Sequence, residues 1–197
     1  MSKIDFNALR DRAYKCACAH GFHNTELSNG HLLMLVITEL SEAVEADRKG
    51  KYFKGISTFE REFNRYSALV DENKRFECAF EKYVKDTVSD EMADAVIRLL
   101  DLAGLRGISL EFANGDIDDC IEDMAEAYKD ETFTESIYSI STLPVRYDGI
   151  FDFPTAVNDM ILSIFGLAKH LDIDLLWHIE HKMKYNELRE NKHGKRY

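Results

Sequence analysis

The sequence predicts an all-α protein, a bundle of amphipathic helices that forms a single domain over residues 1–197. Apolar residues recur at intervals of three and four through most of the chain, as they do on the buried face of a helix. Only two prolines and ten glycines interrupt the 197 residues, so helices can be long. The hydrophobic fraction of 45% and the aromatic fraction of 11% are typical of a chain with a packed core.

Charge and composition exclude several classes of partner. The net charge of −11 argues against a partner of polymeric nucleic acid, whose binding requires cations that neutralise phosphates. No apolar run approaches the roughly 20 residues of a membrane span, and the first residues lack the apolar core of a signal peptide. We therefore expect a cytoplasmic protein with no membrane partner. The cysteines form no CxxC pair and are expected as reduced, mostly buried thiols: Cys16, Cys18, Cys78 and Cys120.

Asp5 is the expected N-cap of a first helix that runs to about His20, since its carboxylate can accept from the free N–H groups of the first turn. A loop follows over residues 21–30. We expect Phe22 and His23 to be exposed in it.

The second predicted helix covers residues 32–51 and carries carboxylates at helical spacing. Ser28 or Asn29 caps it. Glu39 and Glu42 are three residues apart, so they lie about 60° apart around the axis and one turn along it. An apolar stripe runs beside them, formed by Leu35, Val36, Leu40, Ala43 and Val44.

Residues 51–88 read as a helical insert, either one long helix or two shorter ones. Ser57 and Glu60 have the spacing of a capping box. Aromatic residues recur at helical spacing, which favours a core stripe over the alternative of a nucleobase slot: Phe59, Phe63, Tyr66, Phe76, Phe80 and Tyr83.

A second pair of acids, Glu91 and Asp94, lies on the next predicted helix, again three residues apart. Ser89 or Thr87 caps this helix, and Gly107 ends it. Its apolar positions are so dense that we expect it to be buried on most sides: Met92, Val96, Ile97, Leu99, Leu100 and Ala103.

The segment 111–154 adds a helix and a loop. A helix is expected from Leu110 to Tyr128, with an outer face of acids: Asp116, Asp118, Asp119, Glu122, Asp123 and Glu126. Lys129 to Pro154 reads as the least helical part of the chain and is expected to include its longest loop; a short strand at residues 136–140 is possible but not favoured.

Two helices close the chain. Asp152 with Pro154 begins one that runs to His170, and Asp174 caps the last, which runs to about Arg189. A faint internal repeat at an offset of 65 matches residues 102–110 to 167–175. It is read either as a duplicated helix pair or as two helices with similar caps.

Two helices that each offer two carboxylates can form an all-oxygen site for divalent metal. Carboxylates among apolar residues are costly unless they are paired or metal-bound. Mg²⁺ prefers oxygen ligands and commonly bridges carboxylates to substrate phosphates, which suggests metal-assisted hydrolysis of a phosphoric anhydride. Solvated surface acids are the simplest alternative. A di-iron bundle would need Glu-x-x-His, and no histidine follows Glu39 or Glu91 at that spacing.

Three stretches carry a family resemblance. They read ELSEAVEADRKGK from Glu39, DEMADAVIRLLDLAG from Asp90, and KMKYNELRENKHGKRY from Lys182. Together they resemble the ExxE…ExxD signature and the K-x-x-Y-N…R…H-G-K ending of the MazG-like all-α nucleoside triphosphate pyrophosphohydrolases. The resemblance covers about a third of the chain. It implies a helical bundle of the all-alpha NTP pyrophosphatase type, with residues 51–88 inserted.

The resemblance implies Mg²⁺-dependent cleavage of a nucleoside triphosphate between its α and β phosphates, with Mn²⁺ as a substitute ion. The catalytic metal ligands would be Glu39, Glu42, Glu91 and Asp94. Residues near the phosphates or sugar would be Lys182, Tyr185 and Asn186, with Arg189, His193 and Lys195 as further candidates. A homo-oligomer, dimer or tetramer, is expected. The stretch between Glu42 and Glu91 and the segment 111–154 both depart from the family's usual spacing. The alternative to an enzyme is a non-catalytic nucleotide-sensing or interaction module on the same fold.

Overall fold

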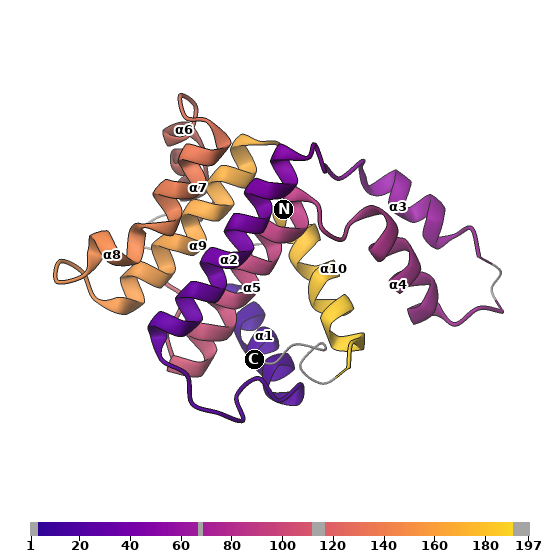
Figure 1. The fold of residues 1–197 in the computed structure, drawn as a ribbon, viewed down its shortest axis with the longest axis horizontal. Coiled ribbons are helices and arrows are strands. Elements are labelled where there is room, and N and C mark those ends of the chain that lie inside the picture. Colours follow the sequence, from indigo (N-terminus) through magenta and orange to yellow (C-terminus); the bar gives the residue numbers. More distant parts are fainter. Residues whose placement is uncertain (1–3, 67–68, 112–116, 191–197) are drawn as a thin grey trace.

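The computed structural model describes residues 4–66, 69–111 and 117–190. This part of the chain forms ten α-helices and no strand, which confirms the predicted all-α class (Figure 1). None of these helices combines the length and the apolar character needed to span a membrane. Their bounds are α1 Phe6–Ala19, α2 Asn29–Arg48, α3 Ile56–Phe63, α4 Glu72–Tyr83, α5 Val88–Arg106, α6 Ile117–Ala127, α7 Phe133–Ser141, α8 Leu143–Tyr147, α9 Phe153–His170 and α10 Leu175–Leu188.

Helix α5 is the centre of the bundle. It packs against α1, α2, α9 and α10, and most of its residues are buried. The side chain of Thr87 accepts from the N–H of Asp90 and begins the helix, and Gly107, in the left-handed region with φ 63°, ends it. α2 lies beside α5 along its length (Figure 1). The predicted acids therefore lie on two neighbouring helices.

Capping side chains set the helix starts as the sequence predicts. Asp5, Ser28, Asp152 and Asp174 each accept a hydrogen bond from a backbone N–H in the first turn of α1, α2, α9 and α10. These bonds satisfy donors that have no partner within the helix. The predicted ends of these helices agree with the observed ones to within three residues, because cap residues and apolar periodicity are both local signals.

The insert forms two helices, α3 and α4, with a small core of their own. Phe59, Phe76 and Phe80 are buried there against Tyr185 of α10, and the unit projects from the main bundle (Figure 1). The aromatic core prediction is confirmed for these residues and for Phe63, which packs against them, but Tyr66 is exposed. The predicted capping box is wrong: α3 begins after Gly55, with φ 95°, and no side chain bonds its first turn.

The segment after α5 is more helical than predicted. α6 begins at Ile117, later than the predicted Leu110, and residues 112–116, including Asp116, lie outside the described residues. The outer acidic face is confirmed for the exposed residues Asp118, Asp119, Glu122, Asp123 and Glu126. The expectation of a long loop within 129–154 is wrong, because that stretch forms α7 and α8, and the possible strand at 136–140 lies inside α7. A capping box between Thr132 and Glu135 begins α7.

The internal repeat falls on two packed helices. The offset of 65 carries Val88, the first residue of α5, onto Phe153, the first residue of α9. α2 with α5 and α6 with α9 are the two most extensive helix pairs, as a duplicated helix pair requires. The second pair has no matching acid pair, because Glu91 corresponds to the buried Ala156.

The four cysteines are free thiols, as predicted. Their predicted burial is wrong in degree: Cys18 is exposed, and the other three are half-buried.

Candidate metal centre

Three of the predicted acids meet between α2 and α5. Glu39 comes from α2, and Glu91 and Asp94 come from successive turns of α5. One carboxylate oxygen of each lies within 4.8 Å of the others. Glu39 and Glu91 are each only 5% exposed. We call these three residues the acid cluster.

Burial makes negative charge costly in the acid cluster. Burial, reinforced by the nearby charges of Asp94 and Asp90, raises the pKa of Glu91 to about 8. Three carboxylates so close together repel one another unless a cation lies among them. The donor set is all oxygen, which suits a hard divalent ion such as Mg²⁺. The residues present therefore fit the metal that the sequence motifs imply.

Glu42 is separated from the acid cluster. It lies one turn beyond Glu39 on α2 and is exposed. Its charge is close enough to raise the pKa of Glu91, although less than burial, Asp94 and Asp90 do. Glu42 thus lies at the rim of the acid cluster, and the structure does not place it with Glu39, Glu91 and Asp94.

Lys182 reaches the acid cluster from α10. Its Nζ lies 2.7 Å from Oδ2 of Asp94 and 2.8 Å from Oδ2 of Asp90. Lys182 is 5% exposed, and burial alone lowers its pKa. Asp94 and Asp90 outweigh that effect and hold the pKa of Lys182 above its ordinary value. The side chain is a buried, permanent cation beside the predicted metal ligands.

Asp90 and Arg98 are two charged residues of this site that sequence reasoning missed. Asp90 is fully buried and is the second partner of Lys182. Arg98 lies one turn beyond Asp94, and its Nε donates to Oε1 of Glu39 at 3.1 Å. Both charges stand among the dense apolar positions of α5. A charge at such a position is a local signal that could have been noticed.

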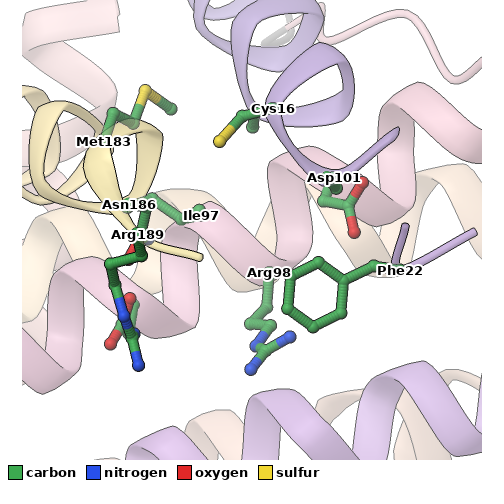
Figure 2. Close-up of a pocket in the computed structure, with 11 residues that line it drawn as sticks. Cys16, Phe22, Ile97, Arg98, Asp101, Met183, Asn186 and Arg189 are labelled. Atoms are coloured by element: carbon green, nitrogen blue, oxygen red, sulfur yellow. The ribbon is translucent and has the colours of Figure 1, made fainter. Parts of the chain in front are cut away.

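A pocket opens beside Asp94 between α1, α5 and α10. It is a cavity of about 60 Å³ whose walls include Ala13, Ile97 and Met183. Figure 2 shows Asn186 and Arg189 on one side of it and Phe22 and Asp101 on the other. Apolar and charged or polar residues line it in nearly equal number, and it is smaller than a typical small-molecule site.

Two polar groups mark this pocket. Asn186 is 8% exposed, and its Oδ1 has no hydrogen-bond partner among the described residues. Asp101 lies on the opposite side, and its Oδ1 is 2.7 Å from Nε2 of His23. A buried amide without a partner is costly, so a ligand group that donates to Asn186 would be favoured here.

The loop after α1 helps to form the pocket. The sequence predicts Phe22 and His23 to be exposed, but both are half-buried. The guanidinium carbon of Arg98 lies 5.8 Å from the centre of the Phe22 ring, and His23 contacts Asp101. The expectation of exposure is wrong because both partners lie on α5, far away in the sequence.

The remaining predicted substrate residues do not all lie at the pocket. Arg189 lines the pocket with Asn186. Tyr185 is stacked on Phe80, with ring centres 4.5 Å apart, and donates to Glu81, both in the insert, while the guanidinium carbon of Arg189 lies 5.6 Å from the centre of its ring. His193 and Lys195 lie outside the described residues.

Comparisons with protein-family models, curated proteins and solved structures found no match.

Proposed function

We propose that the chain is a Mg²⁺-dependent nucleoside triphosphate pyrophosphohydrolase of the MazG-like kind, which converts a (d)NTP to a (d)NMP and pyrophosphate. The observation that carries this proposal is the acid cluster, with three carboxylate oxygens within 4.8 Å at the edge of a pocket. Glu39, Glu91 and Asp94 would hold the ion. When bound, Mg²⁺, or Mn²⁺ in its place, polarises phosphate oxygens and acidifies water.

The chain's own cations would bind the phosphates. Lys182, Arg98 and Arg189 lie beside the acid cluster or in the adjoining pocket. In a chain of net charge −11, such local positive charge is needed to attract a polyanion. Guanidinium groups bind phosphate oxygens through paired donors, whereas an ammonium acts as a point charge.

The pocket would receive part of the nucleoside of the substrate. Its apolar walls and the ring of Phe22 can contact a base or sugar, and the Asn186 amide can hydrogen-bond it. Asp94 lines the pocket and also belongs to the acid cluster. A nucleoside bound in the pocket would therefore have its phosphates at the acid cluster.

Glu42 is the carboxylate left to accept a proton from the attacking water. It is exposed, close to Glu91, and outside the group of three acids. A general base needs access to water and proximity to the reacting phosphate, and the rim of the acid cluster offers both.

A cytoplasmic location and a homo-oligomeric state belong to the same proposal. Four free thiols agree with a reducing compartment. Sedimentation of the purified protein tests the oligomeric state, for which we expect a dimer or tetramer.

Calorimetric titration with Mg²⁺ and a non-hydrolysable triphosphate, followed by a hydrolysis screen over the eight common NTPs and dNTPs, tests the proposal. Wild-type protein should bind and hydrolyse at least one of them. Glu39→Gln and Asp94→Asn should do neither. Glu45→Gln is the matched control, because Glu45 lies on α2 but pairs with Arg48 and Lys49 at the surface. Absence of hydrolysis with all eight, despite binding, would favour a nucleotide-sensing module.

A further inference from the structure

Two of the three acids in the acid cluster already have a cation of the protein as partner. Lys182 lies 2.7 Å from Asp94, and Arg98 lies 3.1 Å from Glu39. Glu91 makes no ion pair in the part of the chain that the structure describes. The acid cluster therefore carries internal counter-charges on the residues that are proposed to bind metal.

Asp90 explains why the ammonium of Lys182 is held in place. It is fully buried, and its Oδ2 accepts both from Lys182, at 2.8 Å, and from the N–H of Asp86, at 3.0 Å. Its carboxylate lies outside the group of three acids. Asp90 can thus keep its bond to Lys182 when Asp94 changes its partner.

A metal ion at the acid cluster and Lys182 would compete for Asp94. A divalent ion needs lone pairs of the Asp94 carboxylate, and it repels an ammonium held 2.7 Å from the same carboxylate. The lysine stem is flexible enough to move the charge by a rotamer change. Asp90 offers a second partner on the buried side.

We propose that Lys182 is a built-in counter-cation of the acid cluster, which neutralises Asp94 until a divalent ion displaces its ammonium, while Asp90 retains the lysine beside the site. This inference rests on the proposed metal centre. The ammonium, which Asp90 keeps beside the site, then has donors released from Asp94 that can meet a phosphate, so that metal binding prepares the site for its polyanionic substrate. Asp90 acts through Lys182 and is a positioning residue.

Mn²⁺ binding without nucleotide, measured by electron paramagnetic resonance of the free ion, tests the proposal. Lys182→Met should bind Mn²⁺ on the order of tenfold more tightly than wild type, because the competing charge is gone. Lys184→Met is the matched control and should leave the affinity unchanged, because Lys184 lies on the same helix over the ring of Phe76. A lysine that served the phosphates alone would leave metal affinity unaltered.

The double variant Asp90→Asn with Lys182→Met guards against misfolding, since it removes the buried carboxylate that would otherwise lose its partner. It should also bind Mn²⁺ more tightly. Nitrogen-15 NMR of the Lys182 ammonium gives a second measurement: its signal should shift or exchange faster on addition of Mg²⁺, whereas in Asp94→Asn it should not respond.

Equal or weaker Mn²⁺ affinity in Lys182→Met and in the double variant would overturn the inference. The proposed metal centre would still be supported if Glu39→Gln bound Mn²⁺ more weakly than wild-type protein. Binding in Lys182→Met but not in wild type supports the inference in its strongest form. No binding in any variant would overturn both the inference and the proposed metal centre.

Discussion

The imidazole of His23 lies 2.7 Å from the carboxylate of Asp101, which attaches the loop after α1 to the middle of α5. Asp101 and the neighbouring Phe22 both line the pocket beside the acid cluster. One hydrogen bond thus fixes one side of the proposed nucleoside site, at a distance from the carboxylates that would hold metal.

His23→Ala should loosen this side of the pocket. We expect KM for the preferred triphosphate to rise roughly tenfold, because a hydrogen bond to a charged group is worth about 1.5–3 kcal/mol. Mn²⁺ affinity should stay unchanged, and steady-state kinetics with direct metal titration measure the two effects. His170→Ala, at an exposed position of α9, is the control. An unaltered KM would show that the loop has no part in binding the nucleoside.

Glu42 and Glu39 should differ in what their substitution removes. Glu42→Gln should lower kcat by about 100-fold or more, the usual contribution of a general base, with Mn²⁺ affinity near that of wild type. Glu39→Gln should lose Mn²⁺ binding. Parallel metal titrations and turnover measurements separate the two roles. If Glu42→Gln weakens metal binding as strongly as Glu39→Gln does, Glu42 is a ligand, as the sequence motif alone predicts.

Local signals account for what the sequence predicted well. Asp5, Ser28, Thr87 and Asp174 begin helices because a short polar side chain can accept from the first turn. The spacing of Glu91 and Asp94 placed both on one face of α5. Spacing also grouped Glu42 with Glu39. The rotation of about 60° around the axis of α2 between them is nevertheless enough to bury Glu39 against α5 and leave Glu42 exposed to solvent.

Contacts between distant segments were not predictable from the sequence. The partners of Lys182 and His23 lie on α5, and no periodicity reports a pairing across so many residues. Two helix starts also differ from the prediction: Ser57 lies inside α3, and the capping box of Thr132 with Glu135 begins a helix where a loop is predicted. Side chains that can cap a helix occur at many non-capping positions, so the motif alone does not locate a start.

Gly166 permits the close approach of α9 to α6. A Cβ at this position would lie 2.3 Å from Cβ of Met124 and 3.0 Å from its backbone carbon. Gly166→Ala should therefore destabilise the fold by about 1–3 kcal/mol, since the helices must separate. Gly30→Ala is the matched control: its nearest neighbour is 4.0 Å away, and it should stabilise by about 0.4–1 kcal/mol. Urea unfolding of both variants measures these changes, and equal stabilities would contradict the close packing.

His178 should make the fold sensitive to acid. Burial, with a smaller effect from His181, lowers the pKa of His178 to about 3, and its Nδ1 is buried without a hydrogen-bond partner among the described residues. The folded state keeps the ring neutral, while the unfolded chain takes up a proton below pH 6.5. The contribution that the neutral His178 ring makes to the free energy of unfolding is thus fully present above pH 6.5 and is lost as the pH falls towards 3.

Between pH 7.5 and pH 5 this loss should be about 2 kcal/mol. His178→Phe keeps an aromatic ring beside Phe53 and Trp177 but cannot take up a proton, so its stability should fall less over that range. Chemical unfolding at several pH values measures the difference from wild type, and His170→Phe at the exposed position should behave as wild type does. Identical pH profiles for His178→Phe and wild type would show that the ring is not held neutral by burial.

The first products formed from the preferred triphosphate test the central claim most directly. Phosphorus-31 NMR during hydrolysis with Mg²⁺, in the absence of any pyrophosphatase, distinguishes the bond that breaks. The proposed function predicts equal amounts of nucleoside monophosphate and pyrophosphate from wild-type protein, and no products from Glu39→Gln. A nucleoside diphosphate with orthophosphate as the first products, or undiminished turnover by Glu39→Gln, would contradict it.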